Sequence, residues 1–294
     1  MDETISSKKN TIISICMITY NHALFIEESI ENILNQIIEN PIELIICDDC
    51  SSDDTETYVN KLINEHPNGF MIKYFRHNEN IGMEKNFIYA LKKCTGKYIA
   101  FCEGDDYWVE KNKLKKQIEI LENNPTYSAC FHNVKVYNGT NENRAVYDLV
   151  DTKEITLEDL FKGFYMKTCS LVIKNQQDKL ASMYKGIIPA DDISLGLSIL
   201  SDGSKAFYLP NLMSVYRVHS GGIWSSKSYR EKMVWSAKNQ ISYLRYFEKS
   251  SKIKILQSHF RSQMILAIKY SITKLDYRLF FKSIFYFVKY GFNY

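Results

Sequence analysis

The first half of the chain alternates short apolar runs with segments in which apolar residues recur at helical spacing. Apolar runs of this length are typical of buried strands, and a spacing of three to four residues is typical of helices. We therefore expect strands over residues 11–19, 42–47, 71–75, 97–102 and 127–137, and helices over 23–38, 55–65, 83–93 and 111–123. Strands that alternate with helices indicate the α/β class, with a doubly wound, mainly parallel sheet.

The second half is less regular and ends in a segment of different character. Its pattern predicts a short helix after residue 156, a strand over 168–173, a helix over 193–200, and strands over 205–209 and 212–217. From residue 229 onward the pattern is helical. We expect one domain over residues 1–225, in two halves of about 11–137 and 138–225, followed by a C-terminal helical extension over 226–294.

Basic and aromatic residues interleave in that extension. Eight lysines and arginines after residue 250 are opposed by a single acid, Asp276, and aromatic residues stand between them. Two interpretations stay open: a helical cap packed on the core, or a surface that touches an anionic membrane from its inner face. No run is apolar enough to predict a membrane span, and the polar first ten residues do not predict a signal peptide.

Composition narrows the class of protein only a little. A net charge of +3, with 24% charged and 45% hydrophobic residues, is ordinary for a folded enzyme and argues against a nucleic-acid partner. Seven cysteines without metal-ligand spacing favour a reduced, cytoplasmic setting. The Cys47-x-x-Cys50 pair is isolated, so we expect it to be structural.

Acidic residues gather where the predicted strands end. Asp105 and Asp106 follow one strand, Asp48 and Asp49 another, and Thr19-Tyr20-Asn21 the first. The carboxyl ends of parallel strands share one edge of a sheet, so these loops should converge on one crevice. Adjacent carboxylates suit a divalent cation or sugar hydroxyls, although Asp is also a common helix cap.

A nucleotide fits this crevice. Tyr20 offers a ring to stack on a base, Asp49 an acceptor for a base N–H, and the second acidic pair ligands for ribose and metal. Neither the Gly-x-Gly-x-x-Gly turn nor the Gly-Lys-Ser/Thr phosphate loop is present. The phosphates therefore need another counter-charge, which a metal ion held by Asp106 would supply.

The spaced set of motifs resembles the family 2 glycosyltransferases of the Rossmann-like type A fold. The motifs are Thr19-Tyr20-Asn21, Cys47-Asp48-Asp49-Cys50-Ser51, Asn80-Ile81-Gly82 with Asn86, Glu103-Gly104-Asp105-Asp106-Tyr107-Trp108, and Tyr216-Arg217-Val218-His219-Ser220-Gly221-Gly222. The resemblance covers about residues 11–225. It implies a nucleotide-sugar donor, often UDP-linked, a Mn²⁺ or Mg²⁺ cofactor, inversion at the anomeric carbon, and a glycan or lipid-linked acceptor. On this basis the N-terminal half would bind the donor and the following half the acceptor.

The resemblance also assigns roles to residues. Asp49 matches the uracil-binding Asp, Asp105 the ribose and sugar contact, Asp106 the metal ligand, and His219 a His that reaches the metal or diphosphate. Further donor-site positions are Thr19, Tyr20, Asn21, Asn80, Gly82, Asn86 and Arg217. Ile18, and Ala190-Asp191-Asp192-Ile193, depart from the usual family wording.

The general base is assigned to one of two neighbouring carboxylates. Alignment with the family favours Asp192, with Asp191 as a capping or second-layer group, but either can serve, and both can be helix caps. Two other functions stay open: a nucleotidyltransferase that makes the nucleotide sugar, and a non-catalytic module that binds a nucleotide or membrane. The first normally needs a Gly-rich basic loop after the first strand, which Thr19-Tyr20-Asn21-His22 is not.

Overall fold

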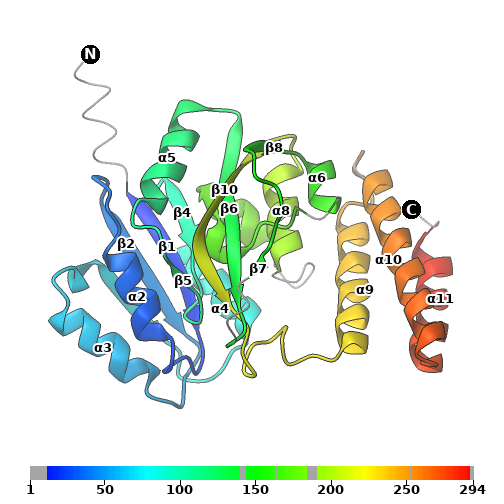
Figure 1. Ribbon diagram of the computed structural model, residues 1–294, viewed down its shortest axis with the longest axis horizontal. Helices are drawn as coiled ribbons and strands as arrows, with labels where there is room; N and C mark the ends of the chain where they lie inside the picture. The colour runs from blue at the N-terminus through cyan, green and yellow to red at the C-terminus, as the bar shows by residue number, and fades with distance from the viewer. Residues whose placement is uncertain (1–11, 140–143, 163, 184–190, 252, 292–294) are drawn as a thin grey trace. The chain divides into compact units, whose positions relative to one another are not determined.

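A computed structural model describes residues 12–139, 144–162, 164–183, 191–251 and 253–291. Contacts divide the chain into two units. The first comprises residues 1–160, 164–184 and 190–218, and the second 161–163, 185–189 and 219–294. Figure 1 shows a sheet with its helices in the first unit, and helices α9, α10 and α11 in the second.

The secondary structure is as follows. The strands are β1 (Ile13–Thr19), β2 (Ile42–Asp48), β3 (Ile72–Arg76), β4 (Tyr98–Phe101), β5 (Tyr107–Trp108), β6 (Tyr127–Tyr137), β7 (Arg144–Ala145), β8 (Lys153–Ile155), β9 (Val172–Lys174) and β10 (Lys205–Arg217). The α-helices are α2 (Ile26–Leu34), α3 (Thr55–Glu65), α4 (Met83–Lys93), α5 (Lys113–Asn123), α6 (Leu157–Phe161), α7 (Gln177–Met183), α8 (Asp192–Leu200), α9 (Tyr229–Tyr246), α10 (Ile253–Thr273) and α11 (Tyr277–Gly291). The 3₁₀ turns among the described residues are η1 (Gly69–Met71) and η2 (Thr168–Ser170).

The strands form one sheet in the order β3-β2-β1-β4-β9-β6-β10-β5, with β7 paired to β6 and β8 to β10. The pairs β3–β2, β2–β1, β1–β4 and β6–β10 are parallel, whereas β9 runs antiparallel to β4 and β6. The prediction of an α/β fold with a mainly parallel sheet and C-terminal helices is therefore confirmed.

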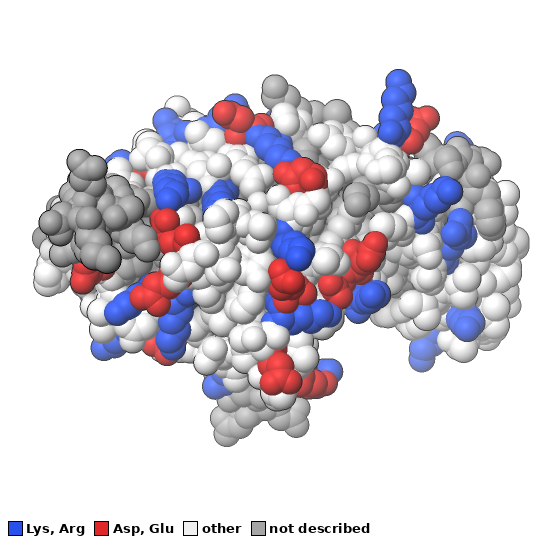
Figure 2. Space-filling view, turned by 90° about the horizontal axis from the view of Figure 1, so that it is seen from above, with Lys and Arg blue, Asp and Glu red and all other residues white. Residues whose placement is uncertain are grey.

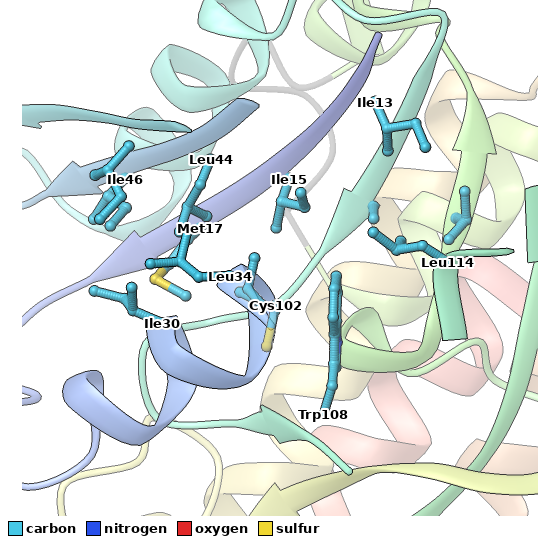
Figure 3. Packing of buried hydrophobic residues seen from close by; sticks show 14 of the residues in the cluster. Ile13, Ile15, Met17, Ile30, Leu34, Leu44, Ile46, Cys102, Trp108 and Leu114 are labelled. Carbon is cyan, nitrogen blue, oxygen red and sulfur yellow. The ribbon is translucent and has the colours of Figure 1, made fainter. Parts of the chain in front are cut away.

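The core explains why the central strands are apolar on both faces. Every residue of β1 except Ile18 is buried, because helices cover both sides of the sheet. In Figure 3, Ile30 and Leu34 of α2 lie beside Met17 of β1, while Trp108 of β5 stands near Cys102. This packing fixes the ends of β1 and β4, from which the candidate site projects.

Three predicted strands differ from the structure. The segment 168–173 begins as the turn η2, since Ser170 directs both its N–H and its hydroxyl to the carbonyl of Lys167, and only β9 is extended. The strands expected over 205–209 and 212–217 form one strand, β10, with a register shift between Leu209 and Leu212. Pro210 lies inside that shift and has no N–H to donate to a neighbouring strand.

The second unit is helical. Helix α10 packs along α11 and also contacts α9, and Phe260, Met264 and Leu279 are buried. None of the helices in the described part of the chain is both long and apolar enough to cross a membrane.

Candidate active site

Three loops meet at the carboxyl ends of β1, β2 and β4. Thr19 pairs with Asp48 in parallel register, and the N–H of Asp49 donates to the carbonyl of Thr19 at 3.0 Å. The N–H of Gly104 donates to the carbonyl of Ile18, also at 3.0 Å. The structure thus brings together the three loops that the sequence placed at one edge of the sheet.

Gly104 allows the third loop to lie against the first. A Cβ at this position would lie 2.7 Å from Thr19 Oγ1, 2.8 Å from Ile26 Cδ1 and 2.9 Å from His22 Nδ1. Real Cβ atoms do not approach so closely, so a larger residue would push the loop outward. The glycine therefore determines where the flanking carboxylates stand.

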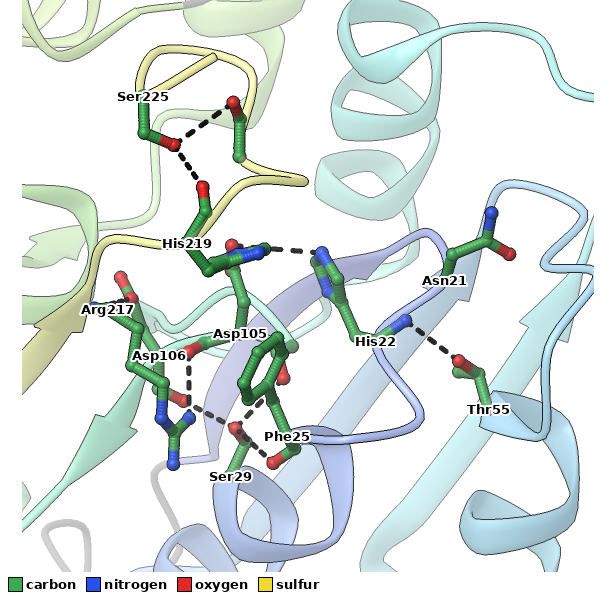
Figure 4. A network of polar contacts seen from close by, with 12 residues as sticks. Asn21, His22, Phe25, Ser29, Thr55, Asp105, Asp106, Arg217, His219 and Ser225 are labelled. Carbon is green, nitrogen blue, oxygen red and sulfur yellow. Dashed lines mark hydrogen bonds and ion pairs between the residues drawn. The ribbon is translucent and has the colours of Figure 1, made fainter. Parts of the chain in front are cut away.

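Asp106 points inward. It is 2% exposed, and its Oδ1 accepts the backbone N–H of Arg217 at 2.9 Å (Figure 4). Its carbonyl accepts the hydroxyl of Ser29 at 2.5 Å. Burial, together with the charges of Asp105 and Glu103, raises the pKa of Asp106 well above its usual range. This carboxyl ties the loop after β4 to the end of β10.

Asp105 points outward. Its side chain is 20% exposed, and its Oδ2 lies 3.7 Å from Nε2 of His22 (Figure 4). A divalent cation binds carboxylate oxygen and imidazole nitrogen at about 2.1 Å, so two such ligands can stand up to about 4.2 Å apart. The separation of Asp105 and His22 therefore fits a divalent cation between them.

Glu103 completes the acidic group. Burial raises the pKa of Glu103 to about 7, with a smaller contribution from the charge of Asp105 and the smallest from that of Asp192. Its Oε2 is enclosed and has no hydrogen-bond partner among the described residues. The charges of Asp105 and Asp192 therefore both act on this one buried carboxyl.

The loop after β2 is fixed by its own hydrogen bonds. Asp49 is 3% exposed, and its two carboxylate oxygens accept the N–H groups of Ile81 at 2.7 Å and Gly82 at 2.9 Å. The latter residue has φ 88° and precedes α4. Each carboxylate oxygen has two lone pairs, so Asp49 keeps acceptor capacity for a ligand.

The other donor-site candidates divide into exposed and buried groups. Tyr20 is 45% exposed, and Asn21 beside it adopts φ 56° while its Oδ1 accepts the N–H of Ser52. Asn80 is exposed, and its Oδ1 accepts the N–H of Gly82. Asn86 is buried, and its Nδ2 donates to the carbonyl of Cys47 at 2.9 Å. Tyr20 and Asn80 are thus the more accessible side chains for a ligand.

Arg217 is occupied within the protein. Its guanidinium pairs with Glu28, donates to the carbonyl of Asp105 at 2.8 Å, and lies 4.1 Å from the ring centre of Tyr107. Only 9% of the residue is exposed. The cation therefore holds the loop of Asp105 in place, and a direct phosphate contact stays a prediction.

The two carboxylates at the start of α8 have different surroundings. Asp191 caps the helix, with its Oδ1 accepting the N–H of Ser194 at 2.8 Å in a capping box. The Oδ2 of Asp192 lies 2.6 Å from Nζ of Lys167, and its side chain is 25% exposed. The charge of Asp192 raises the pKa of Lys167 above its usual range. Asp192 thus pairs with a lysine and keeps exposed surface for a ligand, whereas Asp191 caps the helix.

His219 lies two residues beyond Arg217, at the start of the second unit. Its carbonyl accepts the hydroxyl of Ser225 at 2.5 Å and the N–H of Gly222 at 3.1 Å, which closes this loop (Figure 4). The metal or diphosphate role of His219 stays a prediction.

Three residues near the site were not assigned by the sequence. Glu103 is the first residue of a motif and His22 follows another, so their positions were visible in the sequence but their roles and orientations were not. Lys167 lies in an irregular segment before η2 and has no signal in the sequence pattern. Its pairing with Asp192 is known only from the fold.

A mixed sheet with acidic loops at the carboxyl ends of its parallel strands is typical of the type A glycosyltransferase fold. The family model "Glycosyl transferase family 2" matches residues 14–186, and the chain belongs to this family. The resemblance predicted from the motifs is therefore confirmed.

Relatives extend the comparison. An uncharacterized protein of Mycobacterium tuberculosis is 30% identical over 76% of this chain, which spans 64% of that relative's length. The Escherichia coli protein WfaP, named as a UDP-Glc:alpha-D-GlcNAc-diphosphoundecaprenol beta-1,3-glucosyltransferase, is also 30% identical, over 74% of this chain and 81% of its own.

Solved structures share the fold at low identity. Staphylococcus aureus TarS in complex with UDP-GlcNAc has a TM-score of 0.62 at 17% identity, over 92% of this chain and 89% of that one. The mannosyltransferase PcManGT of Pyrobaculum calidifontis, solved with GDP-Man and Mn²⁺, has a TM-score of 0.60 at 17% identity, over 90% and 76%.

Proposed function

We propose that the chain is an inverting, metal-dependent glycosyltransferase. It moves a sugar from a nucleotide-sugar donor, preferably UDP-linked, to a hydroxyl of a glycan or lipid-linked acceptor in bacterial surface-glycan synthesis. The observation that carries the proposal is the acidic group at the carboxyl end of β4, where Asp105 faces His22 and where the charges of Asp105 and Asp192 both act on buried Glu103. The donor and acceptor named for the relative WfaP support the choice of substrates.

Asp105 is proposed as the metal ligand, in place of Asp106. The sequence interpretation gave the metal to Asp106, but the carboxylate of Asp106 is buried and accepts from Arg217, whereas Asp105 faces His22 across 3.7 Å. A bound Mn²⁺ or Mg²⁺ would offset the charge of the departing diphosphate. The Mn²⁺ in the solved structure of PcManGT supports the choice of ion, and His219 is retained as a further candidate ligand.

Asp192 is proposed as the general base. It is partly exposed, it pairs with Lys167, and its charge acts on the carboxyl of Glu103. A carboxylate in this position can accept the proton of the acceptor hydroxyl as that oxygen attacks the anomeric carbon. Asp191 is already bonded to Ser194, which supports a capping role for it.

Tyr20, Asp49 and Asn80 are proposed to bind the nucleotide. The exposed ring of Tyr20 can stack on a base, and Asp49 can accept from a base N–H with its remaining lone pairs. Buried Asn86 and positive-φ Gly82 act indirectly, by shaping the turn that carries Asn80.

A panel of nucleotide sugars tests the function. The purified chain is incubated with each donor and Mn²⁺ or Mg²⁺, and released nucleoside diphosphate is measured. We expect slow hydrolysis of one donor, which stops with a metal chelator and resumes when the metal is restored. Failure to hydrolyse or transfer from any donor, with the protein folded, would contradict the proposal.

A further inference from the structure

We propose that the second unit has a docking surface for the phosphate headgroups and acyl chains of an anionic phospholipid membrane. The inference goes beyond glycosyl transfer and rests on three features of α9–α11: net charge, an exposed apolar stripe and a basic hollow. All of them lie within residues 219–291, so the argument needs only this unit.

Charge is distributed very unevenly along the chain. Residues 219–294 contain 14 lysines and arginines but only three acids, Glu231, Glu248 and Asp276, a net charge of +11. The whole chain carries +3, so residues 1–218 carry −8. Figure 2 shows basic side chains standing among uncharged surface on its right-hand side, where α9–α11 lie. Such a cationic region attracts polyanionic surfaces.

Helix α11 exposes an apolar stripe. Its members are 37–68% exposed: Tyr277, Phe281, Ile284, Phe285 and Val288. They recur four, seven, eight and eleven residues after the first, so they share one face of the helix. Leu279, Ser283 and Tyr290 are buried on the other side, where α11 packs on its neighbours. The stripe is therefore additional to the packing face.

The basic side chains of α11 flank this stripe. At 100° per residue, Arg278, Lys282 and Lys289 project between the stripe and the buried face. Nζ of Lys289 lies 5.3 Å from the ring centre of Phe285, so its aliphatic stem runs beside the apolar surface. An apolar face with bases along its border is the arrangement of helices that lie in a membrane interface.

A basic hollow adjoins the same helix. It has a volume of about 430 Å³ and is lined by Lys227, Arg230, Lys238 and Lys282, with Trp235 on its wall. The lining residue Glu231 already accepts from the N–H and hydroxyl of Ser228. Because Lys282 belongs to both the hollow and the border of the stripe, a phosphate headgroup in the hollow would have its acyl chains beside the stripe. This continuity favours a phospholipid over a soluble partner.

Vesicle co-sedimentation tests the proposal with the full chain. We expect binding to phosphatidylcholine vesicles that contain phosphatidylglycerol, much weaker binding without it, and loss of binding at high salt. The assay contains no donor and no metal, so its result is separate from the test of glycosyl transfer.

Variants with matched controls assign the binding to the two features. Each of Lys238→Gln and Lys282→Gln should weaken binding about fivefold, since a base near an anionic surface contributes about 1 kcal/mol. Phe281→Ser should weaken binding about tenfold, because it removes an exposed ring that would be buried in the membrane on binding. The controls are Lys115→Gln on α5 and Phe70→Ser, whose side chains are exposed in the first unit and should leave binding unchanged.

Three results would overturn the proposal. One is native protein that does not bind anionic vesicles in a salt-sensitive way. Another is stripe and hollow variants that bind as well as their controls. The last is a native dimer, seen by sedimentation, that Phe281→Ser dissociates, which would make the stripe an interface between two copies of the chain.

Discussion

The two units differ in which side chains they bury and which they expose. In the first unit, charged and amide groups are drawn inside: Asp48, Asp106, Asn86 and Lys113 are at most 2% exposed. In the second, large apolar side chains stay outside, and residues 219–291 contain most of the exposed ones among those described. Both arrangements lower stability compared with the reverse, because buried polar groups lose hydration and exposed apolar ones gain no burial.

This difference in burial indicates which kind of functional feature each unit offers. Buried carboxylates in the first unit are held by specific donors, as Asp106 is by Arg217, so they fix geometry for the accessible carboxylates beside them. The second unit instead exposes large apolar side chains such as Phe281, and a surface of this kind suits a soft, non-directional partner. The following predictions test this contrast, beginning with the largest effect.

The accessible carboxylate at the start of α8 should control the rate. Asp192→Asn keeps the shape of the side chain but removes the proton acceptor, so turnover should fall roughly two to four orders of magnitude. Donor affinity should change little, because the substitution acts on the acceptor's proton. Steady-state kinetics with donor titration by calorimetry measure both quantities.

Asp191→Asn is the matched control. Asn caps helices as well as Asp does, so both rate and melting temperature should stay near native. If Asp191→Asn lost activity while Asp192→Asn kept it, the order of roles within the pair would be reversed.

Asp105 and Asp106 should separate chemistry from stability. Asp105→Ala should lower metal-dependent turnover roughly a hundredfold or more with little change in melting temperature, because the side chain is accessible. Asp106→Ala leaves the N–H of Arg217 without its acceptor and should lower the free energy of unfolding by about 1–3 kcal/mol. Turnover, Mn²⁺ titration and thermal melts distinguish the two.

The sequence interpretation assigns the metal to Asp106, and the ribose and sugar contact to Asp105. An Asp106→Ala variant that melted like the native protein but no longer bound Mn²⁺ would restore that interpretation.

Most of the first unit could be predicted because its elements are local. The apolar runs of β1, β2 and β4 are each flanked by turn residues, and each run is long enough for only one strand. The irregular segments could not be predicted in the same way. Pro210 interrupts a strand that the sheet nevertheless continues, and η2 depends on a serine that bonds back to Lys167.

The site was predictable in residue type but not in orientation. The motif 103–106 predicts carboxylates at a strand end. The alternation of side chains along a strand does not by itself indicate which carboxylate turns inward. That choice depends on Gly104 lying against Thr19 and on Arg217 arriving from β10, more than 100 residues away. Long-range contacts of this kind leave no trace in a local pattern.

Lys113 should be the clearest case of a buried charge that opposes folding. It is fully buried, its Nζ has no hydrogen-bond partner among the described residues, and it lies 4.0 Å from the ring centre of Trp108. Burial lowers its pKa to about 8. Lys113→Met, of similar shape, should raise the free energy of unfolding at neutral pH by up to about 3 kcal/mol, as denaturant titration would measure. Exposed Lys115 on the same helix gives the control, Lys115→Met, with no change expected.

The pH dependence of this difference has a definite sign. Between about pH 8 and 10 the unfolded chain keeps the proton of Lys113 and the folded chain has released it, so the unfolded state binds more protons and stability from this group rises with pH. The advantage of Lys113→Met should therefore shrink over this range. Burial raises the pKa of thiols such as Cys130 to about 12, so their contribution to stability falls as the pH rises. This contribution is present in the native protein and in Lys113→Met alike. The quantity to compare is therefore the difference in free energy of unfolding between the two proteins at each pH. A difference that did not change with pH would mean that Lys113 keeps its proton in the folded state.

Substitution on the exposed face of α11 should have the smallest effect on the free energy of unfolding. Phe281 is 67% exposed, so Phe281→Ser removes little burial and should change the free energy of unfolding by no more than about 0.5 kcal/mol. Phe70→Ser in the first unit, where the ring is 79% exposed, should behave alike and serves as the reference. Denaturant titration of both variants measures the change. A loss of 2 kcal/mol or more for Phe281→Ser alone would mean that the ring is packed against protein in solution. The second unit would then not expose its apolar side chains as described, and the contrast between the two units would fail.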